Sequence, residues 1–120
     1  MVSRIVVADD DTSALEGLRA LLAAWGYEVE TAPDGRAALE AVAMVHPKAV
    51  ITDLVMPSMT GLELLTVLHD EEPELPVILL TSHGSLDTKV DATRRGAYAY
   101  LRKPVDGSTL KAVLASALAA

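Results

Sequence analysis

Residues 4–11 read Arg4-Ile5-Val6-Val7-Ala8-Asp9-Asp10-Asp11, a short apolar run that ends in three consecutive carboxylates. The apolar part is rich in β-branched residues and shows no alternation with polar ones, which is typical of a central strand of a parallel sheet that helices cover on both faces. In an open α/β sheet, functional residues lie at the carboxyl ends of the strands. This stretch therefore predicts both a buried strand and an acidic site at its end.

Four further runs have the composition of strands, and they occupy residues 27–31, 49–52, 77–81 and 97–101. The runs at 49–52 and 77–81 are apolar on both faces, whereas the run at 27–31 alternates and is typical of an edge strand with one wet face. Helical segments lie between the runs. Strand followed by helix, five times over, predicts right-handed crossovers and one parallel sheet with helices on both faces.

The helical segments have recognisable start and stop residues. The first has an apolar face at helical spacing, formed by Leu15, Leu18, Leu22 and Trp25. Ser13 and Glu16 fit a capping box at its start, Asp11 also fits an N-cap, and Gly26 fits a stop. The other helices are expected over about 36–45, 61–72, 85–95 and from 108 to the Ala-rich end.

Composition and charge describe an acidic globular protein. The 120 residues fit a single domain over 1–120, either free-standing or cut from a longer protein, and the net charge is −7. Such a domain has no general attraction to nucleic acid phosphates or anionic lipid. The absence of cysteine excludes disulfides, thiol nucleophiles and zinc–thiolate sites. No apolar run reaches about 18 residues and no signal-peptide pattern follows Met1, so we expect a cytoplasmic protein that does not enter a membrane.

Polar residues follow four of the five predicted strands. Asp9 and Asp10 follow the first strand, Asp53 the third, Thr81 ends the fourth, and Lys103 follows the fifth. Because carboxylates that lie within a few ångströms raise one another's pKa values, a hard divalent cation with oxygen ligands would relieve their repulsion, and Mg²⁺ suits such ligands. Each residue has an ordinary explanation when taken alone. Their joint placement at four strand ends is what predicts a site.

At these residues the chain resembles the response-regulator receiver domains of bacterial two-component signalling. The matching residues are Asp9-Asp10, the segment 53–61, Thr81-Ser82, Tyr100 and Lys103-Pro104. The resemblance covers essentially the whole chain. It implies a flavodoxin-like α/β fold, a three-layer (βα)5 arrangement with a five-stranded parallel sheet in the strand order 2-1-3-4-5. Residues 81–97 look closer to receivers fused to sigma-54-dependent ATPase activators.

The resemblance implies a role for each matching residue. Asp53 is the expected phosphoacceptor, which takes a phosphoryl group from a sensor histidine kinase or a histidine phosphotransfer protein. Asp9, Asp10 and Asp53, with the backbone carbonyl of Val55, are the expected Mg²⁺ ligands. Lys103 is expected to pair first with Asp53 and then with a phosphoryl oxygen. The domain would assist its own phosphorylation and dephosphorylation, and would be a switch rather than an enzyme.

The resemblance also implies a switching face. Thr81 would move towards the phosphoryl group and Tyr100 would rotate inward, which changes the surface formed by the fourth helix, fifth strand and fifth helix. That surface would control an output domain or partner protein. A homodimer of the domain is a further alternative. Lys103-Pro104 is expected to be a cis peptide. The alternative for Tyr100 is a half-buried aromatic residue at the edge of the sheet that has no role in switching.

Two residues are expected to tune the lifetime of the phosphorylated state. In this family, the positions of Val55 and His83 flank the in-line path of water to the phosphorus. Val55 cannot hydrogen-bond a water, which favours a long-lived phosphoryl group. His83 either orients a water, covers the phosphoryl group, or is only an exposed loop histidine.

Competing interpretations fit the residues less well. A flavin-binding domain of the same fold needs a phosphate cradle after the first strand, and the carboxylates of residues 9–11 would repel a phosphate. A phosphatase of the haloacid dehalogenase type usually has a second Asp where this chain has Val55.

The chain also departs from the receiver family at two positions. Many receivers carry Asp and Phe where this chain has Ala99 and Val105. The charged dimer contacts that one transcription-factor subfamily makes through that Asp are therefore in doubt.

Overall fold

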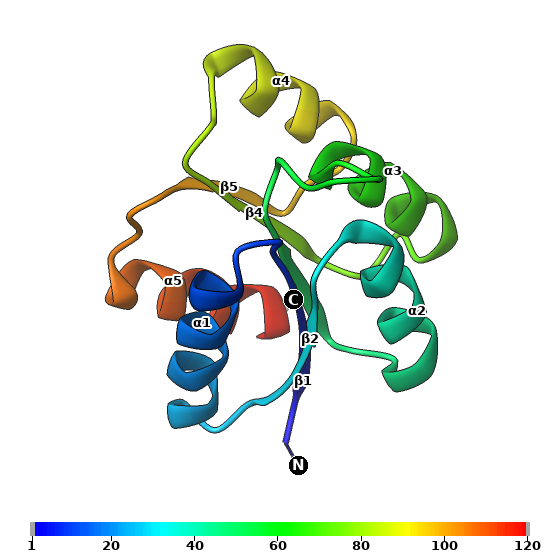
Figure 1. The fold of residues 1–120 in the computed structure, drawn as a ribbon. Helices are drawn as coiled ribbons and strands as arrows, with labels where there is room; N and C mark the ends of the chain where they lie inside the picture. Colours follow the sequence, from blue (N-terminus) through cyan, green and yellow to red (C-terminus); the bar gives the residue numbers. More distant parts are fainter. Residues whose placement is uncertain (1, 120) are drawn as a thin grey trace.

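The computed structural model describes residues 2–119 and shows a five-stranded sheet with helices on both faces (Figure 1). The strands are β1 (Arg4–Ala8), β2 (Glu28–Ala32), β3 (Ala49–Thr52), β4 (Val77–Thr81) and β5 (Ala99–Arg102). Neighbouring strands are all parallel, and their order is β2-β1-β3-β4-β5. The predicted flavodoxin-like order is confirmed. Residues 1 and 120, the ends of the predicted domain, lie outside the described residues.

Each strand is followed by a helix. The helices are α1 (Thr12–Ala24), α2 (Gly35–Val45), α3 (Gly61–Glu71), α4 (Leu86–Arg94) and α5 (Gly107–Ala119). Helices α1 and α5 pack on one face of the sheet, and α2, α3 and α4 on the other (Figure 1). Within residues 2–119, no helix has the length and apolar character needed to cross a membrane. The observed bounds lie within two residues of those expected from the sequence.

The start of α1 differs from the expected capping box. Asp11 is the N-cap, and its carboxylate accepts the N–H groups of Ser13 and Ala14 at 2.9 and 3.2 Å. Glu16 instead forms an ion pair with Arg19 on the exposed side of the helix. The capping box at Ser13 and Glu16 is therefore wrong. The physical reason is that a carboxylate one residue before the helix already satisfies both N–H groups.

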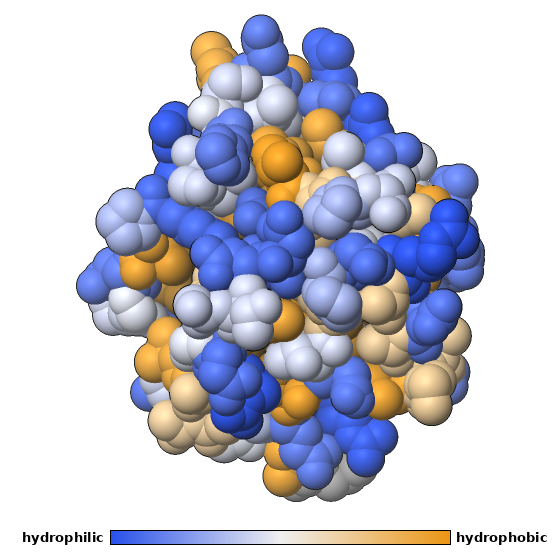
Figure 2. Space-filling view, viewed as in Figure 1, coloured by the Kyte–Doolittle hydropathy of each residue, from blue (hydrophilic) through white to orange (hydrophobic). Residues whose placement is uncertain are grey.

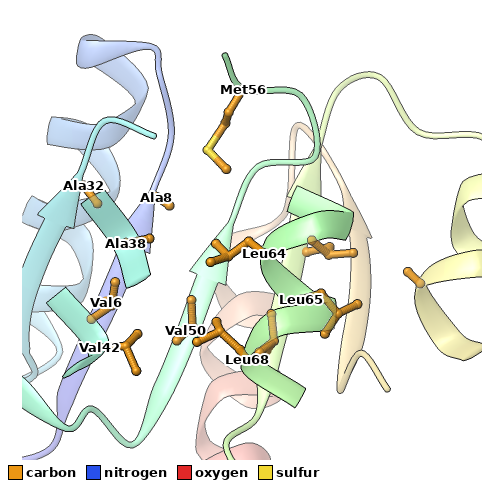
Figure 3. Close-up of a cluster of buried hydrophobic side chains, with 13 residues drawn as sticks. Val6, Ala8, Ala32, Ala38, Val42, Val50, Met56, Leu64, Leu65 and Leu68 are labelled. Atoms are coloured by element: carbon orange, nitrogen blue, oxygen red, sulfur yellow. The ribbon is translucent and has the colours of Figure 1, made fainter. Parts of the chain in front are cut away.

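The core consists of two apolar layers, one on each face of the sheet. Along β1, Val6 and Ala8 contribute to the layer beneath α2, α3 and α4, whereas Ile5 and Val7 contribute to the layer beneath α1 and α5. Figure 3 shows the first layer, in which leucines of α3 lie beside Val50 of β3 and Val42 of α2 lies beside Val6 of β1. Because successive side chains of a strand point to opposite faces, a strand buried on both faces needs an unbroken apolar run.

The edge strand β2 is less buried than its neighbours. Only Ala32 is fully buried, while Glu28 and Glu30 are exposed. This matches the alternation seen in the sequence. Charged side chains on an edge strand also discourage pairing with another chain.

One glycine joins the start of α3 to the backbone that follows β3. The N–H of Gly61 donates to the carbonyl oxygen of Leu54 at 2.8 Å. A Cβ atom at Gly61 would lie only 2.2 Å from the carbonyl oxygen of Asp53 and 2.9 Å from Cα of Leu54. Both neighbours are backbone atoms, which cannot rotate away. The position of α3 therefore depends on the absence of a side chain here.

We expect Gly61→Ala to lower the free energy of unfolding by about 1–3 kcal/mol, because the added methyl group overpacks the backbone after β3. Gly17→Ala is the control, since Gly17 is exposed within α1 and its Cβ would meet nothing within 4 Å. That change should raise the free energy of unfolding by about 0.5–1 kcal/mol. Urea denaturation measures both changes. A free energy of unfolding in Gly61→Ala that is no lower than in the wild type would contradict the role of Gly61.

Candidate functional site

The residues of the acidic edge are held by hydrogen bonds that continue the sheet beyond its strands. The N–H of Asp53 donates to the carbonyl oxygen of Ala8 at 2.9 Å, and the N–H of Asp9 donates to that of Ala32 at 3.1 Å. On the other side, the N–H of Lys103 donates to the carbonyl oxygen of Thr81 at 2.9 Å. The backbone of each residue is therefore positioned by the same pairing that forms the sheet.

Three carboxylates gather at this edge. Asp9, Asp10 and Asp53 each place one carboxylate oxygen within 4.8 Å of the others. Asp9 and Asp53 are buried, with 5% and 9% of their surface exposed, whereas Asp10 is exposed to solvent. An all-oxygen ligand set that is open to water on one side fits a hard divalent cation such as Mg²⁺. The chemistry of these residues therefore fits the ion that the sequence implied.

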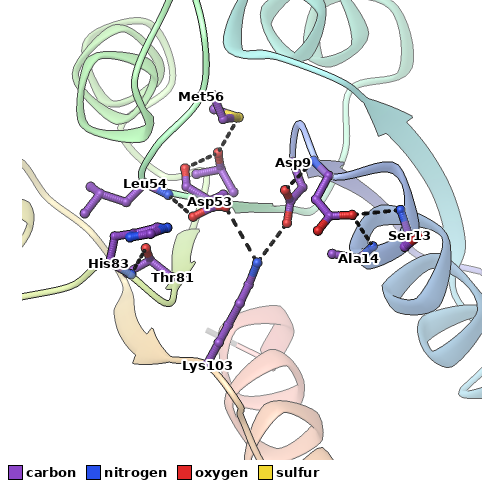
Figure 4. A network of polar contacts seen from close by, with 11 residues as sticks. Asp9, Ser13, Ala14, Asp53, Leu54, Met56, Thr81, His83 and Lys103 are labelled. Atoms are coloured by element: carbon purple, nitrogen blue, oxygen red, sulfur yellow. Dashed lines mark hydrogen bonds and ion pairs between the residues drawn. The ribbon is translucent and has the colours of Figure 1, made fainter.

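Lys103 lies between the two buried carboxylates (Figure 4). Its Nζ atom is 2.9 Å from Oδ2 of Asp9 and 3.6 Å from Oδ2 of Asp53. The other oxygen of each carboxylate is held by the backbone: Oδ1 of Asp9 by the N–H of Asp11 at 2.9 Å, and Oδ1 of Asp53 by the N–H of Leu54 at 2.7 Å. Both remaining oxygens can thus share the one ammonium group.

This arrangement differs in one respect from the sequence expectation, in which Lys103 pairs first with Asp53. Lys103 contacts both carboxylates, and its shorter contact is with Asp9. The flexible lysine stem reaches between two buried charges, so no single partner is imposed on it. The Lys103–Pro104 peptide bond is cis.

The surroundings of Lys103 keep it charged. Burial opposes the positive charge, but the hydrogen bond to Asp9 and the negative charges of Asp53 and Asp9 outweigh it. The pKa of Lys103 is therefore raised above its ordinary value. At neutral pH the site contains one ammonium group that offsets part of the charge of the acidic cluster.

The other candidate residues lie around this cluster. Thr81 is fully buried at the end of β4, and its hydroxyl accepts the N–H of His83 at 3.0 Å. Val55 and His83 are both exposed, in the loops that follow β3 and β4. Tyr100 is half-buried on β5, and its hydroxyl lies 2.6 Å from that of Thr88 on α4. Within residues 2–119, no hydrogen bond joins the side chain of Thr81 or Tyr100 to the carboxylates.

One buried contributor was missed by the sequence reasoning. The hydroxyl of Thr52, the last residue of β3, donates to the carbonyl oxygen of Asp53 at 2.9 Å and lies 3.9 Å from the sulfur of Met56. It supports the turn that carries the carboxylate of Asp53. The available signal was a single hydroxyl residue at the end of an otherwise apolar strand.

The surface of the molecule agrees with a polar site. Figure 2 shows hydrophilic residues gathered in the middle of this face, with apolar residues exposed at separate places around them. An apolar groove of about 490 Å³ lies next to the cluster between α1 and α5. Its walls include Leu18, Leu21 and Val105, and it extends to Asp9 and Lys103.

Comparison with known proteins identifies the family. The model of the response regulator receiver domain matches residues 5–115. The chain belongs to this family. The transcriptional regulatory protein ZraR of Klebsiella oxytoca is 42% identical over 115 residues, which make up 96% of this chain and 26% of that protein. The receiver domain therefore spans about a quarter of the length of this curated relative.

Solved structures show the same fold. A response regulator receiver domain protein from Clostridium thermocellum superimposes with a TM-score of 0.94 at 34% identity, covering 98% of this receiver domain and 95% of that chain. NtrX from Brucella abortus, solved in complex with ADP, superimposes with a TM-score of 0.91 at 35% identity and covers 99% of this receiver domain but 27% of that chain. The resemblance inferred from the sequence is confirmed.

We expect Lys103→Met to destabilise the receiver domain at neutral pH, because it leaves Asp9 and Asp53 without their cation. The folded-state pKa of Lys103 is raised, so its contribution is fully present below the unfolded pKa, about 10.4, and is lost as the pH rises through the folded value. The difference in unfolding free energy between the wild type and Lys103→Met should therefore stay constant from about pH 7 to 9 and shrink above about pH 10.5.

The control for this titration is Lys89→Met. Lys89 is exposed on α4 and takes part in no ion pair within residues 2–119. Denaturation at a series of pH values should show little change for this variant. A loss of stability in Lys103→Met that does not vary up to pH 12 would argue against the ion pairs as its cause.

Proposed function

We propose that this receiver domain is a phosphoacceptor switch in which Asp53 takes a phosphoryl group from a phosphohistidine in a Mg²⁺-dependent reaction. The observation that carries the proposal is the arrangement around Asp53: two further carboxylates within 4.8 Å and the ammonium group of Lys103 at 3.6 Å. A carboxylate among ligands for a divalent cation and beside a fixed positive charge is suited to receive an anionic group.

The transfer involves one bond exchange. An oxygen of the Asp53 carboxylate attacks the phosphorus, the P–N bond to the donor histidine breaks, and its electron pair returns to the imidazole, which takes up a proton. Since Oδ1 of Asp53 accepts the N–H of Leu54, Oδ2 is the oxygen free to attack. Lys103 then binds an oxygen of the transferred group instead of the carboxylate.

A bound Mg²⁺ would supply charge neutralisation to this reaction. Its ligands would be Asp9, Asp10, Asp53 and the backbone carbonyl of Val55. Asp11 contributes by holding Oδ1 of Asp9 through its N–H, which fixes the orientation of that carboxylate. The partner of the reaction would be a sensor histidine kinase or a histidine phosphotransfer protein. The apolar groove between α1 and α5 borders the site.

The phosphoryl group would act on the rest of the domain through Thr81 and Tyr100. The hydroxyl of Thr81 accepts the N–H of His83, which leaves its proton to donate to a phosphoryl oxygen. Movement of Thr81 would then change the space available to Tyr100, and with it the surface formed by α4, β5 and α5. We assign to that surface the control of an output domain or partner protein, in a cytoplasmic protein.

The nature of the output is also a proposal. The curated relative ZraR is named a transcriptional regulatory protein, and the matched region is 26% of its length. Residues outside a receiver domain would therefore supply the output. Residues 81–97 resemble the receivers of sigma-54-dependent activators, which favours a sigma-54-dependent ATPase activator as the output.

Incubation with acetyl phosphate and Mg²⁺ tests the proposal. We expect the intact mass to increase by one phosphoryl group, and we expect no increase in Asp53→Asn or when Mg²⁺ is chelated. Asp70→Asn, which changes an exposed carboxylate on α3, should label like the wild type. Labelling that persists in Asp53→Asn would show that another residue accepts the group.

The lifetime of the phosphorylated state depends on access of water behind the phosphorus. Val55 is 51% exposed, and we propose that its apolar side chain lies beside that path. Val55→Asn supplies a group that can orient water, so we expect faster loss of the phosphoryl group at constant Mg²⁺. Val90→Asn on α4 is the control and should decay at the wild-type rate. An equal or slower decay in Val55→Asn would mean that Val55 does not limit hydrolysis.

A further inference from the structure

Helix α4 has little apolar packing. Ala92 is its only fully buried residue, while Leu86 and Val90 leave 75% and 41% of their surface exposed. Polar contacts therefore contribute much of what holds it. At its C-terminal end, the guanidinium of Arg95 donates to the hydroxyl of Thr66 on α3 at 3.0 Å and to a backbone carbonyl of the same helix. At its N-terminal end the contact is with Tyr100.

Gly84, just before α4, leaves room for the tyrosine hydroxyl. A Cβ atom at Gly84 would lie 2.3 Å from the hydroxyl oxygen of Tyr100 and 3.1 Å from two of its ring carbons. The φ angle of Gly84 does not lie in the left-handed region, unlike those of Gly26 and Gly96. Its backbone conformation is therefore open to any residue. What requires a glycine here is the close approach of Tyr100.

The hydroxyl of Thr88 is the second contact. Its oxygen lies 2.6 Å from the hydroxyl of Tyr100 and accepts the N–H of Ser85 at 2.9 Å, and it donates to the carbonyl oxygen of Ser85 at 3.0 Å. A hydroxyl has one proton and two lone pairs. Because the proton is directed to Ser85, Tyr100 donates to Thr88. The capping box at the start of α4 and the side chain of Tyr100 thus share one oxygen atom.

We infer that Gly84 and Thr88 form a seat that holds the Tyr100 side chain and couples its position to the order of the first turn of α4. Thr88 is then a positioning residue for Tyr100 as well as a helix cap. The consequence for signalling rests on the proposed function. The seat itself does not, because its contacts involve neither the carboxylates nor the transferred group.

The coupling fixes what happens when Tyr100 leaves the seat. The oxygen of Thr88 loses one donor, and the first turn of α4 loses its tether to β5. Since the helix has few apolar contacts to compensate, this turn should open more readily. A displacement of one aromatic ring would then change an exposed helix that presents Leu86 and Val90.

Amide hydrogen exchange on the unphosphorylated domain tests the coupling. Tyr100→Phe keeps the ring and removes the hydroxyl, and we expect the protection of the Lys89 and Val90 amides to fall about two- to tenfold, the value of one hydrogen bond. In a Thr88→Val background, the same change should have no further effect. Equal losses in both backgrounds, or no loss in either, would overturn the coupling and leave Thr88 as a helix cap alone.

A steric variant tests the seat without altering either hydroxyl. Gly84→Ala should displace Tyr100, so that nuclear Overhauser contacts between its ring and Thr88 disappear and the amide of Lys89 loses protection as in Tyr100→Phe. Gly107→Ala is the matched control, because a Cβ there meets nothing within 4 Å. Persistence of the ring contacts in Gly84→Ala would refute the seat.

The outcomes separate this inference from the proposed function. If Asp53 accepts no phosphoryl group but Tyr100→Phe and Thr88→Val are coupled, the proposed function fails and the seat stands. If Asp53 is phosphorylated and the two changes are independent, the seat alone is rejected.

Discussion

The site depends on the electrostatic problem posed by two buried carboxylates at adjacent strand ends. Asp9 and Asp53 each have one oxygen held by a backbone N–H group, and the other oxygen of each faces the ammonium group of Lys103. Without that cation, two negative charges would lie together in a poorly solvated place. Lys103, carried by the loop after β5, supplies the positive charge that balances them, while the third carboxylate, Asp10, stays exposed to solvent.

The sheet provides the rigidity on which this balance depends. Its backbone pairing continues through Asp9, Asp53 and Lys103, so the backbones that carry the charged groups cannot separate without breaking sheet hydrogen bonds. Apolar layers on both faces hold the strands from above and below. The loops after β3 and β4 carry the exposed side chains of Val55 and His83, which suits segments that must respond to a ligand.

The fold could be predicted because its central strands are buried on both faces. An unbroken apolar run such as residues 5–8 indicates a central parallel strand when segments with helical periodicity lie between such runs. The acidic cluster followed from the same reasoning, since parallel strands bring their carboxyl ends to one edge. The family resemblance then supplied roles that spacing alone does not give.

The details that the sequence did not predict depend on atoms brought together by the fold. The sequence offered both Asp11 and the capping box at Ser13 for the start of α1, and only the backbone angles there decide in favour of Asp11. The closer contact of Lys103 with Asp9 depends on the positions of three side chains, which residue spacing does not show. Gly84, which resembles an ordinary loop glycine in the sequence, acquires its meaning only from a tyrosine two elements away.

Helix α4 is held more firmly at its C-terminal end than at its N-terminal end, so it can tilt about the C-terminal end. Arg95 ties one end to α3 through Thr66, whereas the other end depends on a single shared hydroxyl oxygen. A nine-residue helix is about 13 Å long, so a tilt of about 10° around the tied end displaces the far end by about 2 Å and the tied end hardly at all. A partner bound over Leu86 would therefore experience a much larger movement than one bound over Arg94.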